Sequence, residues 1–234
     1  MLRKTVVVST LALLSAPCFS GLYLGGAVGP EGANYTENAH FVTTIAAHPE
    51  SNINTMDENH FSGYGVFGSI FAGYGWNYNR YYLAGEINAN ISSVKRKHTN
   101  TEVFHAHLDT TTYTITNSEG VSVLPGFFLS EGTLLYGRAG YTNGRIKARQ
   151  GDETIQSSTT NRNGVRYGLG LRHDFAEHLT LMMDYSQITY QSIKSHVLIP
   201  AAFSVKDTKT APTSAQFAFG LIYNFDKPQK AYVK

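Results

Sequence analysis

The sequence predicts an all-β membrane protein, folded as a closed, antiparallel, up-and-down barrel of eight transmembrane β-strands. Three observations lead to this fold class. Eight segments alternate apolar and polar side chains, the connections between them alternate between short and long, and the charges inside the segments share one face. Charged residues are only 15% of the chain, and 22 glycines and 15 tyrosines indicate a β protein rather than a bundle of membrane helices.

The segment 215–225 is the clearest of the predicted strands. Because successive strand side chains point to opposite faces, its odd positions form one apolar and aromatic face, made of Phe217, Phe219, Leu221, Tyr223 and Phe225. About eleven residues is also the length that a tilted transmembrane strand requires. Such a face could pack against the core of a soluble sandwich or face lipid. The rest of the chain is therefore needed to decide between a soluble sandwich and a membrane barrel.

The connections favour the membrane barrel. The other predicted strands are residues 21–29, 63–76, 81–92, 118–128, 133–145, 164–175 and 179–190. Short turns join three pairs of them, at residues 77–80, 129–132 and 176–178. Long polar segments make the remaining connections, at residues 30–62, 93–117, 148–163 and 191–214. Short turns at one end and long loops at the other are typical of outer-membrane barrels, whereas connections in soluble domains are mostly short.

Charge placement favours the same fold. Four charged residues fall in the middle of predicted strands, and all four lie on the face opposite the apolar one: Glu86, Arg138, Arg172 and Asp184. An arginine or lysine facing lipid near the bilayer midplane costs about 2–4 kcal/mol, so this segregation is expected of a membrane barrel. We expect the two acids to form ion pairs with the two arginines in the barrel interior.

The first residues read as a secretory signal. Arg3 and Lys4 precede an apolar stretch at residues 5–16, and we expect cleavage after Ser20. The signal would carry away the single cysteine, Cys18, where the preceding proline fits lipid attachment badly. It would also remove two of the 19 basic residues and none of the 17 acidic ones, so the remaining chain is neutral and nucleic-acid binding has no electrostatic support.

Several segments resemble a known family. Residues 21–29 (GLYLGGAVG), 126–140 (GFFLSEGTLLYGRAG) and 217–225 (FAFGLIYNF) look like strands of the eight-stranded outer-membrane barrels, which include the transmembrane domain of outer membrane protein A and the opacity-type surface antigens. The resemblance implies the outer membrane of a Gram-negative bacterium. It also implies that Glu86, Arg138 and Asp184 match an acid, an arginine and a further acid of an interior ion-pair cluster.

The match to that family is incomplete. Arg172 stands where the family example has an acid, Met182 where it has an arginine and Leu124 where it has a lysine, so the detailed pairing is open. Family members end on an aromatic residue that the assembly machinery of the outer membrane reads. Here residues 226–234 follow Phe225, and we expect them to form a short periplasmic tail after a barrel of residues 21–225.

The predicted loops hold the candidate binding residues. Lys95, Arg96, Lys97 and His98 could bind sulfated glycans or the phosphates of lipopolysaccharide, or form a basic rim beside anionic lipid. His98, His105 and His107 have the imidazoles that suit a transition metal, but their spacing is not diagnostic and solvated histidines explain them as well. We therefore expect no metal site and no cofactor.

The sequence thus predicts a monomeric surface protein with periplasmic termini and four long extracellular loops that contact host or environmental ligands. The alternative is a narrow channel for ions or small solutes, gated by the inward charges. A third hypothesis is an enzyme that modifies lipid A, but we expect no enzymatic activity because the outward face offers no nucleophile paired with a base.

Overall fold

The computed structural model describes residues 19–45, 48–101, 108–150, 158–199 and 204–226. This part of the chain folds entirely into β-strands and their connections. The strands are β1 (Phe19–Ile45), β2 (His48–Tyr78), β3 (Tyr81–Ser92), β4 (Lys95–Thr101), β5 (Leu108–Ser130), β6 (Thr133–Gln150), β7 (Ser158–Ala176), β8 (Leu179–Tyr190), β9 (Ile193–Ile199) and β10 (Ser204–Asn224). Within the described ranges, no helix is long and apolar enough to cross a membrane.

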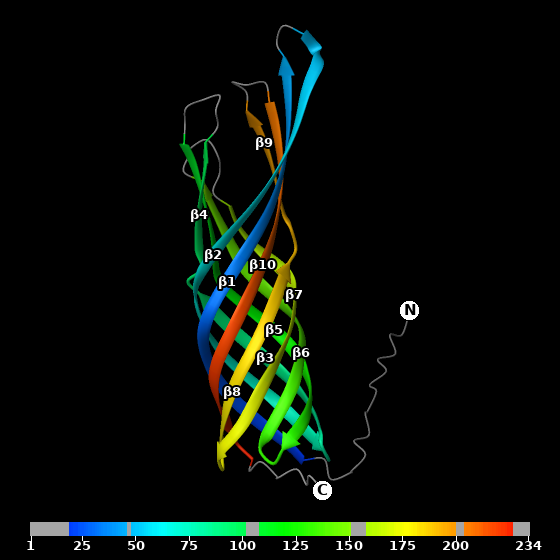
Figure 1. The fold of residues 1–234 in the computed structure, drawn as a ribbon, viewed down its shortest axis with the longest axis vertical. Helices are drawn as coiled ribbons and strands as arrows, with labels where there is room; N and C mark the ends of the chain where they lie inside the picture. Colours follow the sequence, from blue (N-terminus) through cyan, green and yellow to red (C-terminus); the bar gives the residue numbers. More distant parts are fainter. Residues whose placement is uncertain (1–18, 46–47, 102–107, 151–157, 200–203, 227–234) are drawn as a thin grey trace, which may run out of the picture.

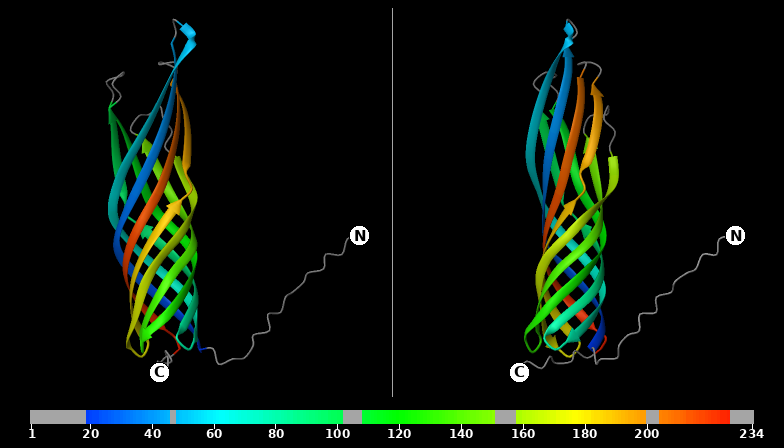
Figure 2. Two further views of the ribbon diagram at one scale, coloured as in Figure 1. Left: turned by 45° about the vertical axis from the view of Figure 1, so that its right-hand side comes forward. Right: turned by 90° about the vertical axis from the view of Figure 1, so that its right-hand side faces the viewer.

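Eight of these strands form a closed ring of antiparallel neighbours, which confirms the predicted fold class. The ring runs β1-β10-β8-β7-β6-β5-β3-β2 and closes through pairing of β2 with β1. The seam between the first and last strands starts at Tyr23↔Asn224, and it removes the edges that an open sheet would expose. Figures 1 and 2 show the ring as a tall barrel of tilted strands.

The two ends of the barrel differ. At the turn end, tight turns join β2 to β3, β5 to β6 and β7 to β8, and two of their residues have positive φ, Asn79 and Gly132. A left-handed backbone suits asparagine and glycine better than other residues, which explains why the chain reverses there. The opposite end is called the ribbon end below.

The predicted extent of the strands is wrong at the ribbon end. Residues 30–62, expected as one loop, are instead a hairpin in which β1 and β2 stay paired from Phe19↔Asn77 to Thr44↔Asn52. The other three predicted loops also contain strand, because β5, β6, β7 and β10 all begin or end inside them and β4 and β9 lie wholly within them. The prediction ended each strand where apolar alternation stopped, but backbone pairing requires no apolar face.

The barrel wall divides at the ribbon end into two sheets, which we call the first ribbon (β9, β10, β1, β2) and the second ribbon (β4, β5, β6, β7). On one side β2 meets β4 only at Tyr64↔Lys95. On the other side the pairing of β7 with β8 ends at Gly164↔Tyr190, and β9 pairs with β10. Figure 1 shows β4 and β5 separated from β1, β2, β9 and β10 at this end.

The interior holds two apolar clusters at different heights. The turn-end cluster gathers around Tyr23, Phe71, Leu124, Tyr136 and Met182. The ribbon-end cluster gathers around Tyr35, Phe61, Tyr113, Ile146 and Ile188. Buried polar residues lie on the inward face between the two sets, among them Glu31, Asn88, Thr142, Arg166, Ser186 and Gln216.

Candidate functional site

The four inward charges that the sequence singles out lie together inside the barrel, and we call them the charge cluster. Arg138 is at its centre: its Nη1 donates to Glu86 Oε1 at 2.6 Å and its Nε donates to Asp184 Oδ2 at 3.0 Å. Arg172 Nη2 donates to Glu86 Oε2 at 2.9 Å. All four residues are only 2–5% exposed, so each charge depends on its partners rather than on water.

Tyrosines complete the charge cluster. Tyr23 donates a hydrogen bond to Glu86 Oε2 at 3.1 Å, and Tyr136 donates one to Asp184 Oδ2 at 2.7 Å. The Arg172 guanidinium lies between the same two rings, 4.7 Å from the Tyr23 centroid and 4.9 Å from the Tyr136 centroid. Cation–π contacts of this kind strengthen when water is excluded, so Arg172 is held by aromatic faces as well as by an acid.

Glycines make the space for these tyrosines. A Cβ atom on Gly73 would lie 2.3 Å from the ring of Tyr23, and one on Gly170 would lie 2.4 Å from the ring of Tyr136. An eight-stranded barrel has just enough interior for its side chains. The small residues opposite the tyrosines therefore allow large polar rings to reach the charge cluster.

Arg166 and Glu31 also carry charges on the inward face, and the sequence did not predict either of them. Arg166 is 5% exposed on β7 and interacts electrostatically with Asp184. It shares the inward face with Arg172, so the same alternation could have found it. Glu31 is 2% exposed and accepts hydrogen bonds from Ser214 and Gln216. It lay in a predicted loop, where no inward face was assigned.

The ribbon-end cluster was also not predicted. Tyr35, Phe61 and Tyr113 form a triangle of rings with 5.3 Å between each pair of centroids. The Tyr113 hydroxyl donates to Glu37 Oε2 at 3.3 Å. Burial raises the pKa of this hydroxyl, and the nearby Glu37 carboxylate raises it further, so Tyr113 acts as a neutral donor.

The predicted basic segment lies on the second ribbon. Lys95 is exposed at the start of β4 and pairs with Thr114. Arg96, Lys97 and His98 follow it along β4, and His105 and His107 lie outside the described residues. In the described ranges, no three His, Cys, Asp or Glu side chains are close enough to hold a metal ion.

The closing strand presents its aromatic face outward. Its five side chains are 36–53% exposed: Phe217, Phe219, Leu221, Tyr223 and Phe225. Phe225 lies just past the end of β10, and its backbone N–H donates to the carbonyl of Leu22 at 3.0 Å.

The predicted domain limits, a signal at residues 1–20, a barrel at 21–225 and a tail at 226–234, stay predictions. β1 begins at Phe19, so the expected cleavage after Ser20 would remove the first two paired residues. Residues 1–18 and 227–234, which hold most of the expected signal and tail, lie outside the described residues.

Comparison with known proteins supports the architecture. A model of the outer membrane protein beta-barrel domain matches residues 6–225. A search of curated proteins finds no match.

Three solved structures illustrate the likeness. OprG of Pseudomonas aeruginosa is 10% identical with a TM-score of 0.50, and the match covers 87% of this chain and 96% of OprG. OmpT, the outer membrane protease of Escherichia coli, is 8% identical with a TM-score of 0.46, covering 88% of this chain and 97% of OmpT. Ail, the attachment invasion locus protein of Yersinia pestis, solved with the heparin analogue sucrose octasulfate, is 14% identical with a TM-score of 0.33, covering 83% of this chain and 99% of Ail. Similarity this low concerns the fold and leaves the role open.

Proposed function

The chain belongs to the outer membrane protein beta-barrel domain family, and we propose that it is a surface protein that binds ligands outside the cell with its two ribbons. In this proposal the barrel anchors the protein as a monomer, the ribbon end is extracellular, and the turn end and both termini are periplasmic. The ligand belongs to a host surface or to the environment, as for an adhesin or surface antigen.

The observation that carries the proposal is the height of the apolar belt. The outward apolar residues of the closing strand run from Phe217 on β10 to Phe225 just past its end, which at about 3.3 Å per residue and a tilt of about 40° spans about 20 Å along the barrel axis. The apolar band of outer-membrane barrels is about 25 Å tall. Beyond the belt most exposed side chains in the described part of the first ribbon are polar, such as Asn34, Lys194 and Lys209, although Met56 is exposed as well. The ribbons therefore project into water.

The ribbons offer backbone as well as side chains to a partner. In the described residues, no strand pairs with β2 between His48 and His60 on the side away from β1. An exposed strand edge can take an extended peptide as an added strand. Long antiparallel ribbons with such an edge support a binding role more directly than a set of unstructured loops would.

The interior supports binding rather than conduction. A solute would have to pass both the ribbon-end ring triangle and the charge cluster, each built from residues that are almost fully buried. The channel remains the second candidate because the layer between them is polar, with Glu31, Asn88 and Arg166 facing inward. Opening it would require breaking ion pairs in a site that is shielded from water, which costs about 3–5 kcal/mol when one partner is removed.

An enzyme is the third candidate, and we propose that this chain is not one. Modification of lipid A would need a nucleophile and a base on the outward face near the outer leaflet. Two contacts of a threonine hydroxyl with a histidine ring face outward in the described residues. Thr36 Oγ1 and His60 Nδ1 are 3.2 Å apart on the hairpin of the first ribbon, beyond the apolar belt. The other, 3.0 Å between Thr133 Oγ1 and His173 Nδ1, lies next to the tight turns. In the proposed orientation this pair lies on the periplasmic side.

A shortened hairpin tests the binding role. Because Thr36 pairs with His60, residues 36–60 can be replaced by an Asn-Gly turn that joins two residues already in register, Tyr35 and Phe61. Cells carrying the full or the shortened protein are then tested for attachment to host cells and extracellular matrix. We expect attachment to fall several-fold with the shortened hairpin, while unchanged attachment would count against the proposal.

Planar-bilayer recording tests the channel in the same preparations. We expect no steady conductance from the full protein. Conductance that disappears or changes in Glu86→Gln would contradict the closed interior and favour the channel.

A further inference from the structure

Exposed cations from two distant segments meet on the outward face of the second ribbon. Lys95 on β4 is aligned with Thr114 on β5, and Thr114 is aligned with Lys147 on β6. Arg145 and Arg149 lie two residues on either side of Lys147 and, like it, are exposed. The side chains of a strand repeat on one face every second residue, so Lys95, Arg145, Lys147 and Arg149 form one outward group, which we call the basic patch.

The spacing of the basic patch suits phosphate groups. Neighbouring strands are about 4.8 Å apart, so Lys95 and Lys147, separated by two such steps, are about 10 Å apart at the backbone. Successive outward positions along β6 are about 7 Å apart. Lysine and arginine side chains reach far enough to converge across these distances, and arginine binds phosphate through two parallel hydrogen bonds.

The height of the basic patch indicates a ligand in the membrane. Tyr64, which is 81% exposed, pairs with Lys95, and the exposed Tyr141 precedes Arg145 by four residues on the same face. Outward tyrosines mark the interface between hydrocarbon and headgroups. The basic patch therefore begins at the level of lipid headgroups, where cations attract anionic lipid.

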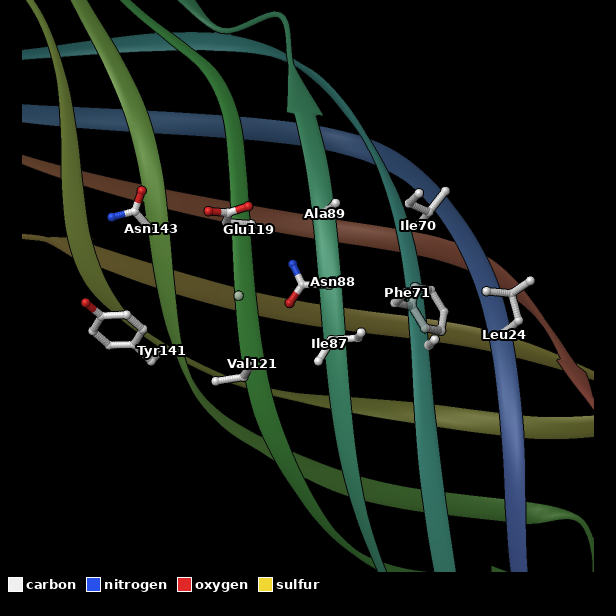
Figure 3. Close-up of a pocket in the computed structure, with 12 residues that line it drawn as sticks. Leu24, Ile70, Phe71, Ile87, Asn88, Ala89, Glu119, Val121, Tyr141 and Asn143 are labelled. Carbon is white, nitrogen blue, oxygen red and sulfur yellow. The ribbon is translucent and has the colours of Figure 1, made fainter.

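An apolar hollow lies on the wall next to the patch (Figure 3). It has a volume of about 540 Å³, and outward apolar side chains of β1, β2, β3, β5 and β6 line it, namely Leu24, Ile70, Ile87, Val121 and Tyr141. The small outward residues Ala72 and Ala89 keep it open. Figure 3 shows Glu119 and Asn143 at its edge nearest the ribbon end.

The same two residues begin a polar hollow of about 610 Å³, in which they are joined by Asn117, Arg145 and Asn161. A carboxylate accepts hydrogen bonds from hydroxyl groups, and an amide both donates hydrogen bonds to hydroxyl groups and accepts hydrogen bonds from them. Glu119 would repel a phosphate placed directly beside it, but it can accept hydrogen bonds from a sugar. Along the barrel axis toward the ribbon end, the wall thus presents first an apolar hollow, then a layer of groups that suit hydroxyls, and then a set of cations.

We infer that this face of the second ribbon binds a phosphorylated glycolipid of the outer leaflet. An acyl chain occupies the apolar hollow, sugar hydroxyls face Glu119 and the asparagines, and phosphates contact Arg145, Lys147 and Lys95. The inference rests on the proposed orientation, which places the start of the ribbons at the level of the outer leaflet, and it is independent of any ligand outside the cell.

Native mass spectrometry of the purified full chain in detergent micelles tests the site. The probe is lipid A with two phosphates, and the fraction of protein that retains it is measured over a concentration series. In the double variant Arg145→Gln/Lys147→Gln we expect the affinity to fall by about tenfold or more. Removing the phosphates from lipid A should weaken its binding to the original protein by about the same factor. The loss should thus be similar whether the phosphates or the two cations are removed.

The matched control is Lys194→Gln/Lys209→Gln. These exposed lysines pair across β9 and β10 on the first ribbon, so the control removes the same charge from another ribbon. We expect it to bind lipid A like the original protein. Equal losses in both variants, or no loss in the first, would overturn the inference.

A soluble sulfated glycan provides a separate arm. If Arg145→Gln/Lys147→Gln loses binding of a heparin fragment but keeps lipid A, the patch recognises a glycan and the lipid inference is wrong. The lipid A measurement uses purified protein in micelles, with no host cells or matrix present. Failure to bind lipid A therefore leaves the attachment assay of the shortened hairpin unaffected, and the two proposals are tested separately.

Discussion

The turn-end half and the ribbon-end half of this barrel share most of their strands and both have apolar clusters inside, but their outward faces differ. On β6, Leu135 and Tyr141 are exposed on the outward face, whereas further along the strand Ile146 is buried inside between the exposed Arg145 and Lys147. On β8 the outward residues are Leu181, Met183 and Tyr185, and the buried apolar residues that follow are Ile188 and Tyr190.

The difference shows where the surroundings change from lipid to water. In lipid the outward face must be apolar, and the interior can hold charges provided that they are paired. In water, apolar side chains are driven inward as in a soluble protein. The change of the outward face from apolar to polar therefore marks the end of the membrane span on β6 and β8. It also explains why one interior cluster surrounds ion pairs while the other is a set of packed rings.

The largest expected effect is at the charge cluster. Arg138→Met leaves Glu86 and Asp184 buried without their shared partner, and the loss of stability should be about 3–5 kcal/mol. Urea unfolding of the purified protein in detergent, followed by gel mobility, measures it. Arg149→Met removes an exposed arginine and should change stability by less than about 0.5 kcal/mol. Equal losses would mean that the ion pairs do not stabilise the turn-end half.

The ring triangle should give a comparable but local effect. Phe61→Ala removes one of its three rings and should cost about 3 kcal/mol. Amide hydrogen exchange should accelerate in both ribbons and stay slow around Arg138. Met56→Ala on the same hairpin, where the side chain is 85% exposed, should have little effect. Faster exchange throughout the barrel would show that the two halves are not independent.

A smaller effect is expected from crowding at the charge cluster. Gly170→Ala places a methyl group against Tyr136 and should cost about 1–3 kcal/mol in the same urea experiment. Gly85→Ala is the matched substitution, since nothing lies within 4 Å of the added Cβ, and it should be neutral or slightly stabilising. If both variants unfold alike, the close fit between Tyr136 and Gly170 has no energetic consequence.

The smallest effect separates two hydroxyls of the ring triangle. Tyr113→Phe removes the hydrogen bond to Glu37 and should cost about 1 kcal/mol. The buried Tyr35 hydroxyl has no hydrogen-bond partner among the described residues, so Tyr35→Phe should be neutral or stabilising. Thermal unfolding of the two variants side by side measures the difference, and the reverse order would contradict the described hydrogen bonding.

The strands of the membrane span could be read from the sequence almost residue by residue. The predicted segments 81–92 and 179–190 coincide with β3 and β8, because lipid imposes an apolar face that alternation reveals. The ribbons could not be read in this way. Outside lipid, Asn, Thr and His face water as readily in a strand as in a loop. The sequence pattern of these residues therefore does not predict which of them pair in strands.

Part of the interior was also accessible from the sequence. Glu86, Arg138, Arg172 and Asp184 could be assigned to the inward face from their position alone. Their partners could not be assigned, because pairing depends on which strands face each other across the barrel. Arg138 on β6 reaches both Glu86 on β3 and Asp184 on β8, although no two of these strands are neighbours.

By itself, the sequence determined the fold class, the membrane face of each strand and the inward position of four charges, because alternation in a lipid environment follows from local chemistry. Tertiary structure alone decided the length of the ribbons, the ring triangle and the meeting of Lys95 with Arg145, Lys147 and Arg149. These features depend on strand register, which aligns residues that are far apart in the chain and which no local pattern encodes.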